Sequence, residues 1–263
     1  MGFRQVFLDI IDLSADAVLD STKLDGLLGR VKERVSRSGF HITDSQVRLL
    51  LTRSWCDALD KAVASRSFST ERQLALNLYR KHFELTSDDV GDEAYFDVLR
   101  MMTILSSLSD DAVIPRFDRN VYAVRFGRLP FNLLDSEELI WVFQNVSYLK
   151  LMTRLSKRLF RSDQYVASME QADTGTLGIS TRHLYFVGSS EVFRVGLDNL
   201  ISIREYRDAI GFVRDTEGAK PEALGMESTD VWFAIEFIDA IRELKNVSPP
   251  DGDSPTLEEL MGE

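Results

Sequence analysis

Several residue types are scarce in this chain of 263 residues, and each scarcity excludes a class of protein. The one cysteine, Cys56, rules out an internal disulfide framework and favours a reducing compartment. No apolar run approaches the roughly 20 residues that a membrane-spanning helix needs. The apolar start of the chain contains Asp9, Asp12 and Asp16, so it does not resemble a secretory signal. The sequence therefore predicts a cytoplasmic protein.

Groups that commonly carry catalysis are also scarce. The three histidines, His41, His82 and His183, lie at no metal-ligand spacing from one another or from Cys56. The chain lacks a G-x-S-x-G nucleophile motif and the glycine-rich phosphate-binding motifs. We interpret Cys56 as a packed thiol, because it falls within an expected helix. The sequence thus predicts no catalytic residue, no metal site and no cofactor, and favours a non-enzymatic protein.

Three acidic pairs, Asp88-Asp89, Asp110-Asp111 and Glu137-Glu138, are candidate sites. Asp88-Asp89 lacks the ligand order of a calcium loop and suits a helix start, where the helix dipole favours acids. Glu137-Glu138 precedes an apolar stretch, and we expect both carboxylates in solvent.

The net charge of −11 is unevenly distributed. Residues 116–170 are net basic, whereas residues 246–263 contain acids and no base. An acidic chain is repelled by nucleic acid, so a nucleic-acid partner is not expected. The proline-rich and acidic composition of residues 246–263 predicts a disordered tail.

Residues 1–115 show the periodicity of a helical bundle domain. The expected helices cover residues 24–35, 46–64 and 93–107. Thr43 and Gln46 form a capping box before the second of these, and Thr70 and Gln73 repeat the device. Thr86 marks a further helix start.

The character of the chain changes at residues 116–130, where Pro130, Gly127 and scattered arginines, with Pro115 just before them, predict a linker. Residues 131–245 then predict a β-domain. The strand signals are residues 139–143 and a series of short β-rich segments from 173 to 215, separated by turn residues. Residues 147–160 fit either a helix or a strand. Residues 228–244 predict an amphipathic helix.

The expected fold class is therefore α+β: an N-terminal helical bundle, then an antiparallel β-sandwich or barrel with a C-terminal capping helix. In that helix Trp232, Phe233 and Phe237 extend the apolar surface beyond one stripe. The surplus would pack on the helical domain or form a dimer interface, so homo-oligomerisation stays open.

The pattern Gly175-x-Leu177-x-Ile179-Ser180-x-x-His183-Leu184-x-Phe186, followed by Phe193-x-Val195, resembles pleckstrin-homology (PH) and GRAM-like domains. The chain is similar to a largely uncharacterised bacterial group built on this module, and the residues that carry this likeness are Phe131-Asn132-Leu133, Ile140-Trp141-Val142-Phe143, Gly211-Phe212-x-Arg214-Asp215 and Ala219-Lys220-Pro221. Residues 64–71 and 83–86 are similar to TerB-like helical domains. The resemblance implies a PH-like β-domain with a closing helix, and a binding or scaffolding role without a named ligand.

Arg154, Lys157, Arg158 and Arg161 form the best candidate contact surface. In a helix all four would align on one face, whereas in a strand Arg154 and Arg158 would share one face and Lys157 and Arg161 the other. They would contact an anionic ligand or lipid, or an acidic protein surface; a solvated face is the alternative. The sequence favours an interaction module that binds protein partners, within a bacterial stress-response or envelope-associated system. Binding to a membrane surface or anionic ligand through residues 154–161, and a hydrolase with an inter-domain site, remain as alternatives.

Overall fold

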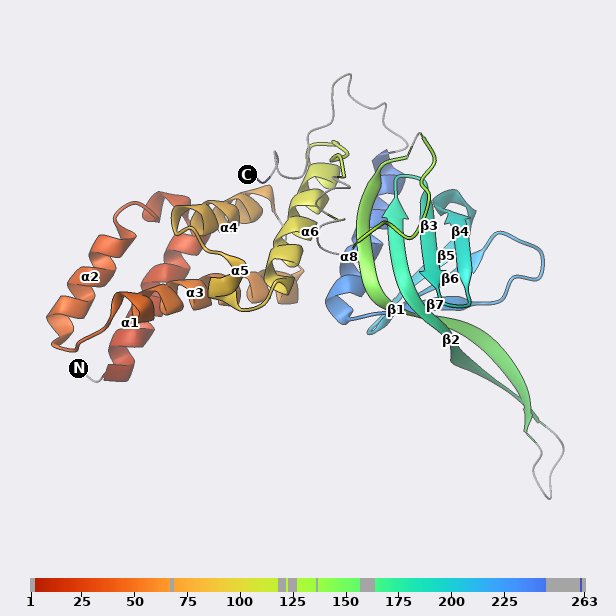
Figure 1. The fold of residues 1–263 in the computed structure, drawn as a ribbon, viewed down its shortest axis with the longest axis horizontal. Helices are drawn as coiled ribbons and strands as arrows, with labels where there is room; N and C mark the ends of the chain where they lie inside the picture. The colour runs from red at the N-terminus through yellow and green to blue at the C-terminus, as the bar shows by residue number, and fades with distance from the viewer. Residues whose placement is uncertain are drawn as a thin grey trace. The chain divides into compact units, whose positions relative to one another are not determined.

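A computed structural model describes residues 3–66, 69–117, 122, 127–135, 137–156, 164–244 and 261 (Figure 1). These residues belong to two compact units, residues 1–106 and residues 107–263. The first unit is helical, and the second contains every described strand.

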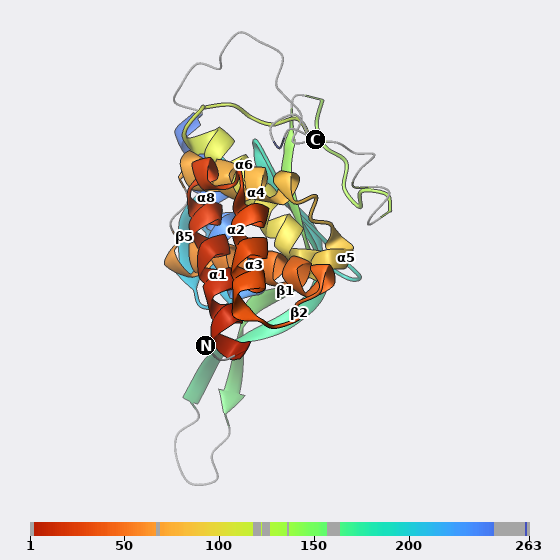
Figure 2. The same cartoon turned by 90° about the vertical axis from the view of Figure 1, so that its left-hand side faces the viewer.

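The helical unit begins with a helix that we did not predict from the sequence. Its elements are α1 (Phe3–Leu19), η1 (Ser21–Lys23), α2 (Leu27–Ser38), α3 (Asp44–Ser65), α4 (Thr70–His82), α5 (Ser87–Val90) and α6 (Ala94–Ser109). Helix α1 packs against α2, α3 and α4, and Figure 2 shows it beside α2 and α3. Val6 and Ile10 of α1 are fully buried, whereas Asp9 binds Arg34 of α2. The acids that argue against a signal peptide thus lie on the polar side of an amphipathic helix.

Helix starts in this unit follow the capping chemistry of the sequence, with one exception. The Thr43 and Gln46 capping box is present, and so is one between Thr86 and Asp89, which confirms the helix start at the acidic pair. The predicted box at Thr70 is wrong. Ser69 caps α4 instead, accepting a hydrogen bond from the Arg72 backbone N–H at 3.2 Å, because Thr70 is already helical.

Seven antiparallel strands form the sheet of the second unit. They are β1 (Leu139–Ser156), β2 (Gln164–Ser180), β3 (His183–Gly188), β4 (Val192–Gly196), β5 (Leu200–Tyr206), β6 (Ala209–Arg214) and β7 (Glu222–Gly225). The spatial order is β4-β3-β2-β1-β7-β6-β5. Helix α8 (Ser228–Leu244) follows and contacts β2, β5 and β6. This arrangement confirms the predicted α+β, PH-like fold.

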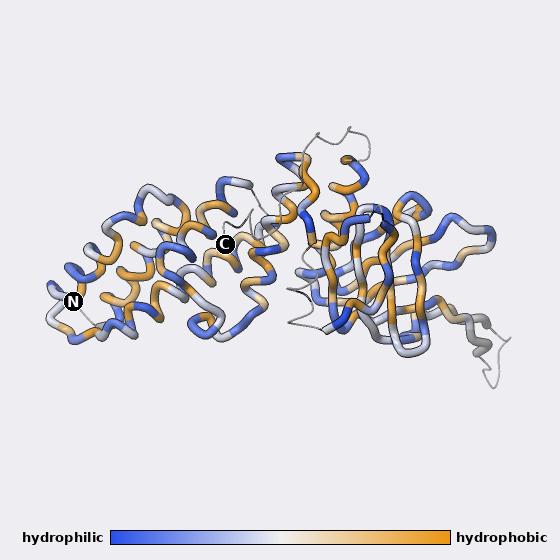
Figure 3. The backbone as a smooth tube through the Cα atoms, turned by 45° about the horizontal axis from the view of Figure 1, so that its top comes forward, coloured by the Kyte–Doolittle hydropathy of each residue, from blue (hydrophilic) through white to orange (hydrophobic). Residues whose placement is uncertain are grey.

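The sheet is not a closed barrel, because β4 and β5 end the order of the described strands. Its inner side carries a cluster of rings in which Phe186 stacks on Phe193 at 5.3 Å between centroids, next to Tyr148. Figure 3 shows hydrophobic stretches running through the strands and α8. The ambiguous residues 147–160 continue β1 as a strand to Ser156, and the rest of that range lies outside the described residues.

The aromatic side chains of helix α8 are buried. Trp232 is 5% exposed, and Phe233 and Phe237 are fully buried within the chain. These rings are therefore unavailable for the dimer interface that the sequence left open. Among the described residues, no helix is long and apolar enough to cross a membrane.

Candidate functional site

Strands β1 and β2 run past the rest of the sheet as a two-stranded ribbon (Figure 1). Strand β7 pairs with β1 only over Ser147–Lys150, and β3 pairs with β2 only over Gly175–Ile179. Beyond these positions, among the described strands, β1 and β2 pair only with each other, from the Leu151 and Met169 pair to the Ser156 and Gln164 pair. We define residues 151–156 and 164–172 as the free ribbon.

The register divides the free ribbon into two faces of different composition. One face holds the cross-strand pairs Leu151 with Met169, Thr153 with Ala167, and Leu155 with Tyr165. The other holds Met152 with Ser168, Arg154 with Val166, and Ser156 with Gln164. Met152 and Met169 are 45% and 40% exposed. Flexible, polarizable methionine side chains are common at binding surfaces, so both faces offer contacts.

A pair of glycines marks the point where β2 leaves β3. Gly175 lies directly opposite Gly188. A Cβ atom on Gly175 would lie 2.2 Å from the carbonyl oxygen of Val187, a backbone atom that cannot rotate away. The two backbones therefore approach at the base of the free ribbon to a distance that only glycine permits.

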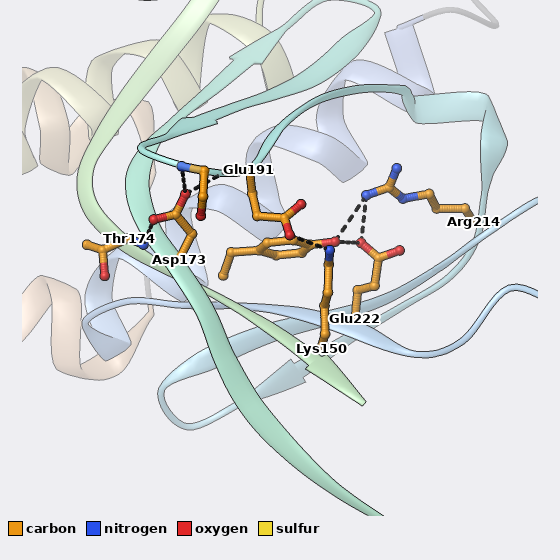
Figure 4. A network of polar contacts seen from close by, with 8 residues as sticks. Lys150, Asp173, Thr174, Glu191, Arg214 and Glu222 are labelled. Atoms are coloured by element: carbon orange, nitrogen blue, oxygen red, sulfur yellow. Dashed lines mark hydrogen bonds and ion pairs between the residues drawn. The ribbon is translucent and has the colours of Figure 1, made fainter. Parts of the chain in front are cut away.

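The base of the free ribbon is also fastened by a buried carboxylate (Figure 4). Asp173 accepts hydrogen bonds from the backbone N–H groups of Ser190 at 2.7 Å and Glu191 at 2.8 Å. It also accepts from the Thr174 N–H at 2.8 Å and the Ser189 hydroxyl at 2.9 Å. The backbone donors hold the pKa of Asp173 well below its usual range. The turn after β3 is thus bound to β2.

The cations near this base already have anionic partners. Lys150 Nζ lies 2.7 Å from Glu191, and the Arg214 guanidinium lies 2.6 Å from Glu222 (Figure 4). Glu222 also accepts a hydrogen bond from the Tyr148 hydroxyl. Burial, and then the hydrogen bond and charge of Glu222, raise the pKa of Tyr148. An anionic ligand would have to displace these carboxylates, so we assign this network to linking β1, β6 and β7 rather than to binding anions.

The predicted basic contact falls largely outside the described residues. Arg154 lies in β1, in a strand rather than in the helix that would have aligned the four cations. Its side chain, and the whole of Lys157, Arg158 and Arg161, lie outside the described part of the chain.

Glu137 is a buried residue that the sequence interpretation placed wrongly in solvent. Its side chain is 0% exposed, and it contacts His183 Nδ1 and the Tyr185 hydroxyl, both on β3. The Leu134 N–H donates to it at 3.3 Å. Burial alone would raise the pKa of Glu137, but the hydrogen bonds from Tyr185, His183 and Leu134 outweigh it and lower that pKa. Glu138 is exposed, as predicted.

The Glu137 cluster fastens the segment before β1 to the outer face of the sheet. Phe131 stacks on Tyr185 at 5.3 Å, and the two rings share an apolar cluster with Leu139 and Val142. Burial and the Glu137 carboxylate raise the pKa of Tyr185 to about 12. In enzymes, a glutamate that is hydrogen-bonded to a histidine can orient that histidine as a general base. Within the described ranges, however, no hydroxyl or thiol is hydrogen-bonded to the His183 ring, so we assign this cluster to packing.

The helical unit contains two further candidate features, a single thiol and a groove. Burial and nearby aspartates raise the pKa of the half-buried Cys56 to about 11, so its thiol stays protonated near neutral pH.

A groove of about 350 Å³ has a mixed lining of Leu28, Lys32, Asp44, Val47, Arg48, Leu51, His82, Phe83, Glu84 and Leu85. The Arg48 guanidinium is bound by Asp89 at 2.5 Å, and Lys32 faces the acids Asp44 and Glu84 in the same lining, so the groove offers no surplus of positive charge. Across the described residues, no three metal-ligating side chains gather.

The chain has only weak similarity to known proteins. No family model and no curated protein matches the chain. Among solved structures, it is similar to the PDZ-RhoGEF DH/PH domains in complex with activated RhoA, with 12% identity, a TM-score of 0.27, and coverage of 89% of this chain and 69% of that one. The corresponding values for the linker-DH/PH domains of p115-RhoGEF are 11%, 0.25, 92% and 70%.

An activated truncation of Vav1 is similar at 13% identity and a TM-score of 0.26, over 91% of this chain. The chain spans only 59% of that Vav1 chain. TM-scores this low carry no conclusion about function. The PH-like assignment therefore rests on the chain's own strand order and closing helix.

Proposed function

We propose that the protein is a non-enzymatic interaction module, and that its β unit binds a protein partner through the free ribbon. The observation that carries the proposal is the extension of β1 and β2 beyond both neighbouring strands, with Met152 and Met169 exposed. We further propose that it acts in the cytoplasm, in the bacterial stress-response or envelope-associated setting that the sequence resemblance favours.

Physical reasoning supports the ribbon as the binding element. A two-stranded ribbon is marginally stable in water, because it buries little apolar surface. Its outer edges present backbone N–H and C=O groups without a strand partner among the described residues. Extended segments bind such edges by strand addition, in which main-chain hydrogen bonds give affinity and side-chain contacts give specificity. A partner would therefore stabilise the free ribbon as it binds.

A photo-crosslinking residue placed at Met152 in the full chain is expected to capture a discrete partner in cells. The same residue at Leu74, which is 52% exposed on α4, is the matched control and is expected to give no such product. The captured protein is then purified and its affinity for the chain is measured by calorimetry. Met152→Lys should weaken binding about tenfold, since it puts a charge in the contact. Equal products from both positions, or an unchanged affinity, would contradict the proposal.

The alternative is binding of an anionic surface through residues 154–161, which contain four bases and no acid. It predicts that the chain floats with vesicles containing anionic phospholipid and that Arg154→Glu combined with Arg158→Glu abolishes flotation. High salt should also release the protein, because exposed charges are screened. A parent chain that does not float eliminates this alternative. A hydrolase remains the other rival, and profiling with phosphoester and peptide substrates tests it.

A further inference from the structure

We propose that the outer edge of β2 in the free ribbon pairs antiparallel with the same edge of a second copy of the chain. The inference rests on the proposed function, in that it takes the free ribbon as the interaction element. The second copy occupies the β2 edge, and the protein partner that contacts Met152 is a separate occupant of the free ribbon. The pairing would join two ribbons into a four-stranded sheet about a two-fold axis.

From Gln164 to Gln171 the β2 edge lacks the features that usually protect exposed strands. Among the described strands this stretch of the edge is unpaired, and a bulge at Ala172 ends it next to Asp173, which binds the turn after β3. Residues 164–172 contain no proline, glycine, lysine or arginine, and their one charged residue is Glu170. Soluble proteins normally interrupt such an edge with a proline, a bulge or a lysine. An edge this long and nearly uncharged is suited to pairing. The β1 edge at residues 151–156 is shorter and contains Arg154.

The β2 edge is also complementary to itself. A two-fold axis at Ser168 uses the regular part of the edge before the bulge at Ala172, and the opposing pairs would be Tyr165 with Gln171, Val166 with Glu170, and Ala167 with Met169 of the second copy. No acid opposes an acid in this register, and each pair lies on one face, as antiparallel pairing requires.

The intramolecular register extends this match across four strands. Leu151 pairs with Met169, and Thr153 pairs with Ala167. In the dimer, Met169 would therefore lie between Leu151 of its own chain and Ala167 of the second copy. Leu151, Met169 and Ala167 of the two copies would form an apolar centre on one face of the joined sheet, and each ribbon would gain a third and a fourth strand, which stabilise a sheet much better than two.

The register is tested by cross-linking at the two-fold axis. In a Cys56→Ser background, Ser168→Cys would place two thiols directly opposite one another, at a Cβ separation that a disulfide spans. Oxidation of the full chain is expected to give a covalent dimer in high yield. Thr153→Cys, exposed on the neighbouring strand, is the matched control and is expected to stay monomeric under the same conditions. Equal yields from both variants would overturn the inference.

Sedimentation velocity measures the dimer without a cross-link. The parent chain is expected to dimerise, and Ser168→Lys should weaken the dimer at least about tenfold, because two lysines would face each other at the axis. Met152→Lys puts its charges a strand further apart and should leave the dimer intact. Circular dichroism checks that both variants fold. A parent chain that is monomeric throughout, or a dimer indifferent to Ser168→Lys, refutes self-pairing. Loss of the Met152 cross-link alone refutes only the proposed function.

Discussion

Replacing Gly175 with alanine is expected to destabilise the β unit by about 3 kcal/mol. The new methyl group would lie 2.2 Å from the Val187 carbonyl oxygen and 2.7 Å from Gly188 Cα. Both are backbone atoms, so relief requires β2 and β3 to separate at the base of the free ribbon. Hydrogen exchange should show faster opening of both strands, and thermal unfolding followed by near-ultraviolet circular dichroism should shift downward.

Gly29 provides the matched control for the same chemical change. It lies inside α2, and a Cβ atom placed there meets nothing within 4 Å. Gly29→Ala is therefore expected to stabilise the helical unit by about 1 kcal/mol, because alanine loses less backbone entropy in a helix. Equal behaviour of the two variants would show that the β2 and β3 backbones do not approach as closely as described.

Replacing Glu137 with alanine is expected to cost about 3 kcal/mol, since it leaves the Tyr185 hydroxyl, the His183 ring and the Leu134 N–H without their acceptor. Glu138→Ala is the adjacent control and should change stability by less than about 0.5 kcal/mol, because Glu138 is exposed. Urea unfolding of the full chain measures both. A similar loss in the two variants would contradict the buried position of Glu137.

Glu137 also makes the stability of the β unit depend on pH in the acid range. The pKa of Glu137 is lower in the folded protein than its usual 4.5, so the folded state binds fewer protons at this site than the unfolded state. Its contribution is complete above pH 4.5 and is lost as the pH falls further through the folded pKa. The stability difference between the parent chain and Glu137→Gln should therefore shrink below pH 4.5. A difference that stays constant with pH would show that Glu137 does not fold ionised.

Much of the fold was predictable because its signals are local. Amphipathic spacing located α2, α3, α6 and α8, and turn residues separated the strands from β3 to β6. Strand β7 was missed because Glu222–Gly225 is short and contains no β-branched or aromatic residue. It is a strand only because neighbours on both sides supply hydrogen bonds. Helix α1 was missed because the acids on its polar side were weighed only against a signal peptide.

The candidate site was far less predictable. Glu137 is buried by partners 46 and 48 residues away in sequence, so local charge pointed to solvent. The free ribbon begins where β7 and β3 stop pairing with β1 and β2, and the hydrophobic periodicity of the sequence does not show those positions. Exposed methionines in a β-rich stretch, such as Met152 and Met169, were the available signal. The sequence prediction placed the contact surface at the neighbouring basic residues instead.

The short strand β7 has a consequence for the order of events during synthesis. Each of its residues, from Glu222 to Gly225, pairs with β1 on one side and β6 on the other. Strands β1 to β4 and the β5–β6 hairpin leave the ribosome before it. Among the described residues, the strands of the two halves of the sheet therefore share no backbone hydrogen bonds until Glu222–Gly225 has been synthesised. A nascent chain halted before Glu222 would carry two separate β-sheets, each with an extra open edge exposed to chaperones.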